Sequence, residues 1–316
     1  MDADLAGMRA FVAAAEELHF GRAAARLFLT QQALSKRIGR LEEALGAPLF
    51  ERTTRSVALT PAGHRLLPLA LDALDAFDTA VEAVRGVPVP LRVDVYHERF
   101  TPMEAIRRLV AAEPSITVEP SMRQGLAAAV PALLRREIDA AFGRAHDLGR
   151  PWPDELARRL FSLVPLHAFV LDGHPLATRR ALTVAELKDA GIVMPDPGAS
   201  TEWHGYLTRL AAELGVPLRF AEPAIGMLGY RQLMERENRS VAVAEKEMTL
   251  PSGDGMVRIP IVEPVPLFPW SIVWHRQNRA PSLVRLLALL EPPAVPDGPS
   301  FWLPALDLRW AREAGP

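Results

Sequence analysis

The 316-residue chain contains no cysteine, so it can form no disulfide, thiolate metal site or cysteine nucleophile. No stretch approaches the run of about 18 apolar residues that a membrane-spanning helix needs. The first residues, MDADLAGMRAF, carry acids where an export signal carries bases. We therefore expect a cytoplasmic protein with no membrane partner.

Motifs of several enzyme classes are also missing. The chain has no G-x-S-x-G elbow, no Walker-type phosphate loop and no H-E-x-x-H motif, and its histidines are scattered without metal-ligand spacing. We expect neither catalysis nor a cofactor or metal. With a net charge of −2, the chain as a whole lacks the excess of basic residues that is typical of nucleic-acid-binding proteins. The charge must therefore be examined segment by segment.

The length predicts two or three domains, and an apolar content of 49% is enough to bury a large core. Residues 1–65 hold nine basic and seven acidic residues, a net charge of +2. This weakly basic balance does not by itself decide whether the segment binds nucleic acid.

Residues 30–63, TQQALSKRIGRLEEALGAPLFERTTRSVALTPAG, are the most informative stretch. Thr30 can cap a helix over 31–45, and Gly46 can end it. The apolar positions recur at helical spacing and can anchor this helix to a core: Ala33, Leu34, Ile38, Leu41 and Leu45. The polar leading face can reach bases or phosphates in a major groove: Gln31, Gln32, Ser35 and Lys36.

The stretch LFERTTRSVALT has a strand–turn–strand pattern with Arg52 and Arg55 near its tip. Two earlier helices are predicted over 4–17 and 21–27. Three helices followed by a basic hairpin are typical of a winged helix-turn-helix DNA-binding domain. A generic three-helix bundle with a polar face is the simpler alternative.

Each polar residue also has a structural interpretation. Gln31 can serve only to cap the helix, and Ser35 can bond back to the carbonyl four residues earlier. Lys36 and Arg37 can form a solvated face. Arg40 fits a phosphate contact and a solvated charge equally well.

Residues 5–65 resemble the N-terminal domain of the LysR-type transcriptional regulators. The resemblance rests on an ordered series of matches: Phe11-Val12, HFGRAA at 19–24, Leu27, TQQALSKRI at 30–38, LE at 41–42, LG at 45–46, LFER at 49–52 and LTPAG at 59–63. It implies that Gln31, Gln32, Ser35 and Lys36 face the major groove and that Arg52 and Arg55 approach the minor groove or backbone. Thr30 and Arg40 complete the candidate DNA-binding set.

Two positions depart from the family pattern. Many members have Pro where this chain has Gln32, and Arg is common at the position of Lys36. A glutamine adds a donor and an acceptor, whereas lysine keeps the charge and loses the bidentate fork of arginine. The preferred bases are therefore expected to differ.

Thr60-Pro61 is a good helix start, and no glycine lies between Gly63 and Gly86. The predicted helix carries an apolar stripe of Leu67, Leu71, Leu74, Val81 and Val84, and Pro68 should bend it. Such a helix is about 37 Å long, so we expect its stripe to meet another chain. Packing on its own domain is the alternative. The resemblance implies antiparallel pairing of two such helices, which matches a two-fold DNA site.

From residue 91 onward, strands and helices alternate, which favours an α/β layer with parallel strands. The predicted strands lie at 91–95, 116–122, 138–142, 167–171, 191–195, 218–223, 240–244 and 271–275. The predicted helices lie at 102–114, 126–136, 185–190, 202–214, 226–236 and 281–290.

Through IDAAFGR at 138–144, GHPLA at 173–177 and the element order, this half resembles LysR-type regulatory domains. That implies two α/β lobes like those of type 2 periplasmic binding proteins, with crossovers near 162–166 and 263–268. The expected organisation is a winged domain at 1–60, a linker helix at 61–86 and a regulatory domain at 87–291. Lobe one would be 91–162 with 267–291, lobe two 163–266, and 292–316 a C-terminal extension.

A ligand in such a fold lies between the lobes, near helix N-termini that can bind an anion. Phe100-Thr101 and Ser200-Thr201 open helices, and Arg144 directly follows a strand. These residues, with Trp203, are the candidate effector-binding set. Arg144 could instead join a surface ion pair, Thr101 and Ser200 could only cap helices, and Trp203 and Tyr230 could be core residues. Leu126 replaces a frequent Thr or Ser, which favours a more apolar pocket.

The extension contains linker-like PPAVPDGPS followed by FWLPALDLRW, which could pack on the regulatory domain, pair with a neighbour or stay mobile. The function predicted from the resemblance is a DNA-binding regulator controlled by a small molecule, with an anionic effector as one candidate. Its expected partners are double-stranded DNA with an interrupted inverted repeat, a second copy forming dimers and tetramers, and RNA polymerase. A regulator that answers to a protein partner or to concentration alone, and an exported solute-binding protein, are the alternatives.

Overall fold

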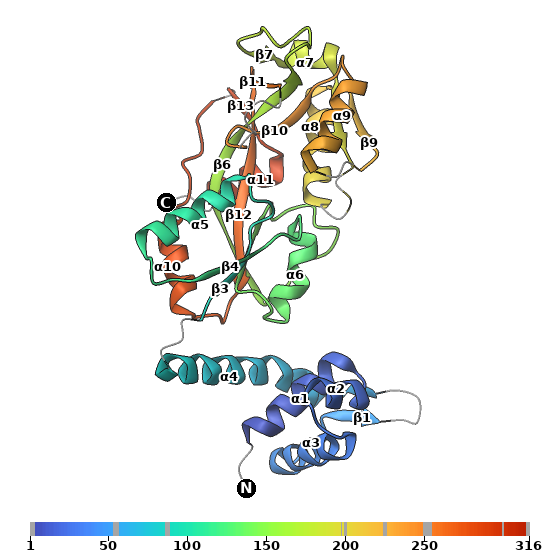
Figure 1. The fold of residues 1–316 in the computed structure, drawn as a ribbon, viewed down its shortest axis with the longest axis vertical. Helices are drawn as coiled ribbons and strands as arrows, with labels where there is room; N and C mark the ends of the chain where they lie inside the picture. Colours follow the sequence, from blue (N-terminus) through green and yellow to red (C-terminus); the bar gives the residue numbers. More distant parts are fainter. Residues whose placement is uncertain are drawn as a thin grey trace. The chain divides into compact units, whose positions relative to one another are not determined.

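The computed structural model describes residues 4–52, 57–85, 89–196, 198, 201–223, 226–248, 255–298 and 300–313. The chain divides into two compact units, Met1–Val89 and Pro90–Pro316. Each unit has a hydrophobic core of its own. Figure 1 shows the elements of each unit along the chain.

The first unit is a three-helix domain with a short hairpin and a long C-terminal helix. Its elements are α1 (Leu5–Glu17), α2 (Phe20–Arg26), α3 (Gln31–Leu45), β1 (Phe50–Arg52), β2 (Val57–Leu59) and α4 (Pro61–Arg85). Phe50 joins the hairpin to the helices, since its ring lies 5.6 Å from that of Phe11 and 5.4 Å from that of Phe20, centroid to centroid. The predicted three helices and hairpin are confirmed.

Local chemistry sets the helix ends. The Thr60 hydroxyl accepts a hydrogen bond from the Gly63 backbone N–H at 3.0 Å and donates one to the Pro48 carbonyl at 2.7 Å. α4 therefore begins at the predicted Thr-Pro pair, and the same threonine ties it to the hairpin. A Cβ atom at Gly63 would collide with the Leu49 carbonyl oxygen, so this close approach requires glycine.

The helix α4 continues through Pro68, and its apolar side chains divide between two environments. Ala70 and Leu74 are buried in the core of the first unit, with Leu66, Leu67 and Leu71 packed against it. Part of the predicted dimer stripe thus packs on its own unit. Leu69, Phe77 and Val84 are the large apolar side chains of α4 that stay exposed.

The second unit is built on a mixed sheet with strand order β4-β3-β5-β12-β6-β11-β7; β10 also pairs with β6, and β13 with β12. Its strands are β3 (Leu91–Asp94), β4 (Val118–Ser121), β5 (Ala140–Gly143), β6 (Leu156–Leu171), β7 (Leu182–Thr183), β10 (Ala242–Glu245), β11 (Met256–Val262), β12 (Val265–His275) and β13 (Phe301–Trp302). A separate parallel pair is formed by β8 (Ile192–Pro195) and β9 (Leu218–Ala221).

The prediction of parallel strands holds for β3 with β4 and β5, but not for the centre of the sheet. There, β6 and β12 are long antiparallel partners from Leu156↔His275 to Pro165↔Leu267. The crossovers expected near 162–166 and 263–268 are parts of these strands or border them. In Figure 1, β6 and β12 run side by side through the unit and connect its two ends.

Helices flank both ends of this long pair (Figure 1). They are α5 (Thr101–Ala112), α6 (Leu126–Leu134) and α10 (Pro281–Leu289) near one end, and α7 (Val184–Ala190), α8 (Thr201–Leu214) and α9 (Gly226–Arg236) near the other. This is the two-lobed α/β arrangement that the sequence predicts.

The C-terminal extension packs on the second unit. β13 adds to β12 in parallel, and α11 (Ala305–Glu313) follows it. The Trp302 ring lies 5.4 Å from that of Tyr206 on α8, and its Nε1 donates to Glu213 at 3.0 Å. The Trp310 ring lies 5.6 Å from that of His146. Of the three possibilities for this segment, the structure shows packing on the second unit.

Candidate nucleic-acid interface and ligand cavity

Helix α3 is capped, anchored and polar where a DNA-reading helix would be. The Thr30 hydroxyl accepts from the Ala33 N–H at 3.2 Å, and Gly46 at the C-terminus has a φ of 67°. Leu34, Ile38 and Leu41 are buried. The exposed side is formed by Gln31, Gln32, Lys36, Arg37 and Arg40, whereas Ser35 is half-buried. A rigid helix thus presents the cationic donors of Lys36, Arg37 and Arg40. It also presents the side-chain amides of Gln31 and Gln32, which can both donate and accept, as recognition in a groove requires.

The hairpin after α3 is fixed by a side chain that sequence inspection did not single out. Glu42 Oε1 accepts hydrogen bonds from the backbone N–H groups of Leu49 at 2.8 Å and Phe50 at 3.3 Å. The strands pair as Phe50↔Leu59 and Arg52↔Val57. The side chain of Arg52 and all of Arg55 lie outside the described residues, so their DNA contact stays a prediction.

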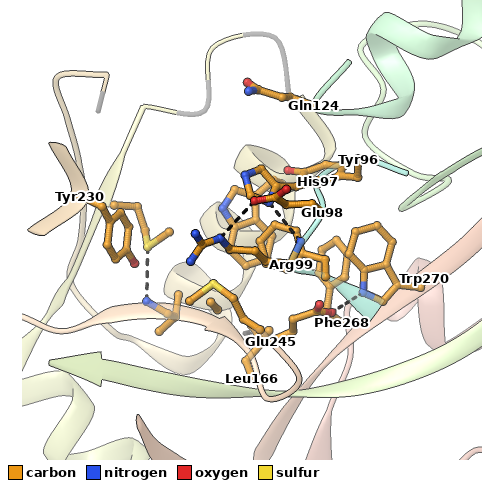
Figure 2. A pocket seen from close by; sticks show the side chains of 16 residues that line it. Tyr96, His97, Glu98, Arg99, Gln124, Leu166, Tyr230, Glu245, Phe268 and Trp270 are labelled. Carbon is orange, nitrogen blue, oxygen red and sulfur yellow. Dashed lines mark hydrogen bonds and ion pairs between the residues drawn. The ribbon is translucent and has the colours of Figure 1, made fainter. Parts of the chain in front are cut away.

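The second unit contains a cavity of about 400 Å³ between its two ends. The loop after β3, β10, β12 and α8 all contribute to its lining, and Figure 2 shows Tyr230 on the opposite side from Tyr96 and Trp270. The lining residues are Tyr96, His97, Glu98, Arg99, Phe100, Gln124, Leu166, Met194, Trp203, Tyr230, Val243, Ala244, Glu245, Met248, Phe268 and Trp270. The volume suits a small organic molecule.

Aromatic rings form much of the wall. Trp270 lies 5.4 Å from Tyr96 and 5.0 Å from Phe268 between ring centroids, both edge to face. Trp203 stands edge to face on Phe268 at 5.2 Å. Such edge-to-face packing holds the rings in defined orientations around the cavity.

Glu245, at the end of β10, is a buried carboxylate in the cavity wall. Its Oε1 accepts from the Thr101 backbone N–H at 2.5 Å. Its Oε2 accepts from the Thr101 hydroxyl at 3.0 Å and from Trp270 Nε1 at 2.7 Å. Burial raises the pKa of this carboxyl to about 7, against the opposing effect of the hydrogen bonds that it accepts.

The other charged groups belong to the loop after β3. Arg99 Nε lies 3.7 Å from Glu98 Oε1, and the Arg99 backbone N–H donates to His97 Nδ1 at 3.3 Å. Burial lowers the pKa of His97, which keeps its ring neutral near neutral pH. The cavity lining therefore carries the Glu98–Arg99 ion pair and the buried acid Glu245.

The predicted effector residues occupy different places. Phe100 and Trp203 line the cavity. The hydroxyl and the backbone N–H of Thr101 both donate hydrogen bonds to Glu245. Ser200 and the Thr201 side chain lie outside the described residues.

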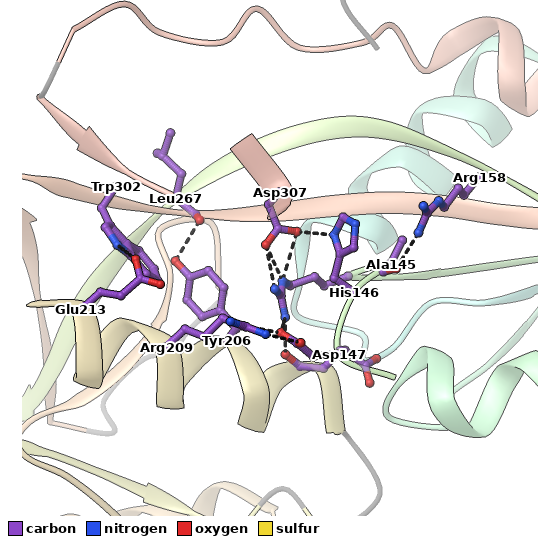
Figure 3. Close-up of polar contacts among 12 residues, drawn as sticks. Ala145, His146, Asp147, Arg158, Tyr206, Arg209, Glu213, Leu267, Trp302 and Asp307 are labelled. Atoms are coloured by element: carbon purple, nitrogen blue, oxygen red, sulfur yellow. Dashed lines mark hydrogen bonds and ion pairs between the residues drawn. The ribbon is translucent and has the colours of Figure 1, made fainter. Parts of the chain in front are cut away.

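Arg144 was expected to point into the cleft, but the structure places its side chain elsewhere. It does not line this cavity; its fully buried guanidinium lies 2.7 Å from Asp307 on α11 and 2.7 Å from Asp147. Arg209 also bonds Asp147, at 2.8 Å (Figure 3), and together these cations hold the pKa of Asp147 well below its usual range. An arginine so paired has its charge satisfied by the protein.

A second buried acid, Glu202 on α8, reaches the start of α6. Its Oε1 accepts from the Leu126 N–H at 2.5 Å, and its Oε2 has no hydrogen-bond partner among the described residues. Burial raises the pKa of Glu202 to about 7. Glu202, Glu245 and Asp307 were not selected from the sequence, because no local motif marks these acids and their partners are distant in the sequence.

Comparison with known proteins gives the same division of the chain. Residues 5–64 match the profile of the bacterial regulatory helix-turn-helix protein, lysR family, and residues 100–291 match that of the LysR substrate binding domain. The chain belongs to the LysR family of transcriptional regulators. As a LysR-type protein it is a DNA-binding transcriptional regulator, as the N-terminal motifs predicted.

Curated relatives cover nearly the whole chain. It is 32% identical over 301 residues to the HTH-type transcriptional regulator IlvR of Caulobacter vibrioides, spanning 93% of this chain and 100% of that protein. It is 30% identical over 299 residues to XapR of Escherichia coli, spanning 91% and 97%.

Solved structures share the fold. A full-length OxyR variant from Pseudomonas aeruginosa has a TM-score of 0.62 at 20% identity and covers 92% of this chain and 98% of its own. Full-length CbnR complexed with its target DNA has a TM-score of 0.53 at 20% identity and covers 91% and 98%. No helix in the described part of this LysR-type chain has the length and apolarity to cross a membrane.

Proposed function

We propose that this LysR-type regulator binds an interrupted inverted repeat in duplex DNA as a dimer. The observation that carries the proposal is the exposed polar start of α3. Gln31, Gln32 and Lys36 project from a helix whose opposite face is buried through Leu34 and Ile38. A rigid helix with this division can present amide and ammonium groups to base edges and phosphates. Ser35 and Arg40 extend the same face, and Arg52 and Arg55 would reach the flanking backbone.

The dimer would use the outer part of α4. Leu69, Phe77 and Val84 are exposed on this helix, whereas Ala70 and Leu74 are buried in the core of the first unit. Exposed apolar side chains along a 25-residue helix suit pairing with a second copy. A symmetric pair would present two copies of α3 and would therefore match a two-fold DNA site. We further propose that two dimers associate into a tetramer and that the DNA-bound protein contacts RNA polymerase. The regulator would act in the cytoplasm.

A small molecule in the cavity would control this regulator. The cavity lies between groups from both lobes: Phe100 and Arg99 from the loop before α5, and Trp203, Tyr230 and Glu245 from the other side. A ligand that contacts both lobes shifts the equilibrium between two arrangements of the lobes only if it binds one arrangement more tightly than the other. Such a shift would alter dimer association and the footprint on DNA.

The test is selection of bound sequences from random duplex DNA with the full chain. We expect a two-fold motif whose half-sites lie about one helical turn apart. The double variant Ser35→Ala plus Lys36→Ala should lose it, whereas Arg107→Ala, an exposed arginine on α5, should keep it. A folded wild-type protein that enriches no motif would contradict the proposal.

The effector half has a separate readout. A saturable rise in melting temperature with a small molecule, accompanied by a changed footprint on the selected site, would support it. A regulator whose melting and footprint respond to no small molecule would instead answer to a protein partner or to concentration.

A further inference from the structure

The N-terminus of α5 is a position built to bind an anion, and the chain fills it with its own side chain. Helix N-termini attract negative charge through their free N–H groups and the helix dipole. Phe100, at the cap position, has no side-chain acceptor to offer, and Pro102 has no N–H. The Thr101 N–H is satisfied by Glu245, which arrives from β10 at a separation of 144 residues.

The donor set around Glu245 is one that a free carboxylate ligand would also need. Thr101 gives an N–H and a hydroxyl, and Trp270 gives an indole N–H, so both oxygens of the carboxylate are bonded. Charge-assisted hydrogen bonds of this kind are stronger than neutral ones. A second carboxylate cannot use these donors while Glu245 holds them, and it would meet like charge beside it.

Aromatic rings form much of the remaining cavity wall. Trp203, Phe268 and Trp270 stand edge to face, and Phe100 and Tyr230 extend the wall. Arg99 is the cation of the lining, and it lies beside the Glu98 carboxylate at 3.7 Å. Ring faces and thioethers favour a flat apolar ligand.

We propose that Glu245 is a built-in substitute for an anionic ligand, so that this cavity takes an uncharged aromatic compound in preference to an aromatic carboxylate. The inference rests on the proposed effector cavity and names the chemical class of its ligand. It replaces the anionic effector considered from sequence. Glu245 selects the ligand by occupying the donors of Thr101 and Trp270.

Benzamide and benzoate are matched probes, because they share size and ring and differ in charge. Ligand-observed NMR titration of the full chain at pH 8 should show benzamide binding wild type at least tenfold more tightly than benzoate. Glu245→Ala vacates the donors, and benzoate affinity should then rise at least tenfold. Glu245→Gln fills the same space without charge and is the matched control, for which benzoate should stay weaker than for the alanine variant.

Acetate gives an independent readout. It should raise the melting temperature of Glu245→Ala saturably by several degrees, relative to sodium chloride of equal ionic strength, and should not do so for wild type or Glu245→Gln. Equal or tighter binding of benzoate by wild type, or no binding of benzamide, would overturn the ligand class. An alanine variant that responds to acetate and benzoate as wild type does would overturn the role of Glu245.

The ligand class can be decided even if one variant does not fold. If Glu245→Ala does not fold, the wild-type preference between the two probes and the glutamine variant still decide the ligand class. All readouts use the protein without DNA. Failure of DNA selection would therefore leave the ligand result standing, and the reverse also holds.

Discussion

The carboxylate of Asp307 lies 2.7 Å from the guanidinium of Arg144, and both side chains are fully buried. The two residues are 163 positions apart, one after β5 and the other on α11. His146 Nδ1 lies 2.8 Å from the same carboxylate (Figure 3). The C-terminal extension thus supplies a counter-charge to a cation inside the regulatory unit.

Replacing Asp307 should destabilise that unit. Asp307→Ala leaves Arg144 buried with Asp147 as its remaining carboxylate partner in the described network. Removing one member of a buried pair typically costs about 3–5 kcal/mol, and we expect the lower end because Asp147 stays. Urea unfolding would measure it, with exposed Arg309→Ala on the same helix as control. A loss equal to that of the control would show that the pair contributes little.

The second prediction concerns Trp302. This side chain packs on Tyr206 and donates to Glu213, so Trp302→Ala removes buried area and one hydrogen bond. Loss of a buried tryptophan typically costs about 3–5 kcal/mol. The free energy of unfolding of the regulatory unit should fall accordingly, while DNA-binding by the first unit persists. Trp302→Phe, which keeps most of the packing, should lose less.

The third prediction concerns pH and Glu202. Burial raises the pKa of Glu202 from 4.5 in its ordinary state to about 7 in the fold. Between those values the folded state binds more protons than the unfolded state, so the contribution of this group to stability falls as pH rises. A pKa shift of this size lowers the free energy of unfolding by ~3 kcal/mol at pH 8, relative to low pH where the carboxyl is protonated in both states.

Glu202→Gln stays neutral and avoids that loss. Relative to wild type, it should therefore gain stability between pH 5 and pH 8. The comparison at each pH cancels the contributions of His167 and His275, whose pKa values burial lowers to about 4. A stability difference that does not change with pH would contradict a raised pKa for Glu202.

The fourth prediction concerns the tie between α3 and the hairpin. Glu42→Ala leaves the N–H groups of Leu49 and Phe50 without their shared acceptor. Partly buried donors left unpaired typically cost about 1–3 kcal/mol. Thermal melting of the first unit should show the loss, and exposed Glu43→Ala should not. Unchanged melting would mean that water replaces the carboxylate at no cost.

The fifth prediction separates two roles on α3. If Lys36 contacts a phosphate, Lys36→Ala should weaken binding to all sequences and reduce the slope of log K against log salt by about 1. Gln32→Ala should instead change the preferred bases with little effect on that slope. Fluorescence anisotropy over a salt series would measure both. An altered base preference for Lys36→Ala would assign it to a base edge.

Local elements followed closely from the sequence. Helix α3 spans the predicted residues 31–45 because its signals are local: Thr30 caps one end, Gly46 adopts a left-handed φ at the other, and apolar residues recur every three or four positions. The long strand β6 was predicted as 167–171 and extends back to Leu156. Arg158 and Arg159 interrupt its apolar pattern, and pairing with β12 keeps it extended.

Short-range signals in the chain were enough to predict the three helices and hairpin of the first unit, the start of α4 after Thr60, and the family through its ordered motifs. Those features depend on residues a few positions apart. Only the folded chain reveals that Thr101 pairs with Glu245, that Arg144 pairs with Asp307, and which aromatic rings meet in the cavity. The Thr101–Glu245 and Arg144–Asp307 pairs join residues more than 100 positions apart, and their partners are fixed by sheet pairing and burial, which no local pattern encodes.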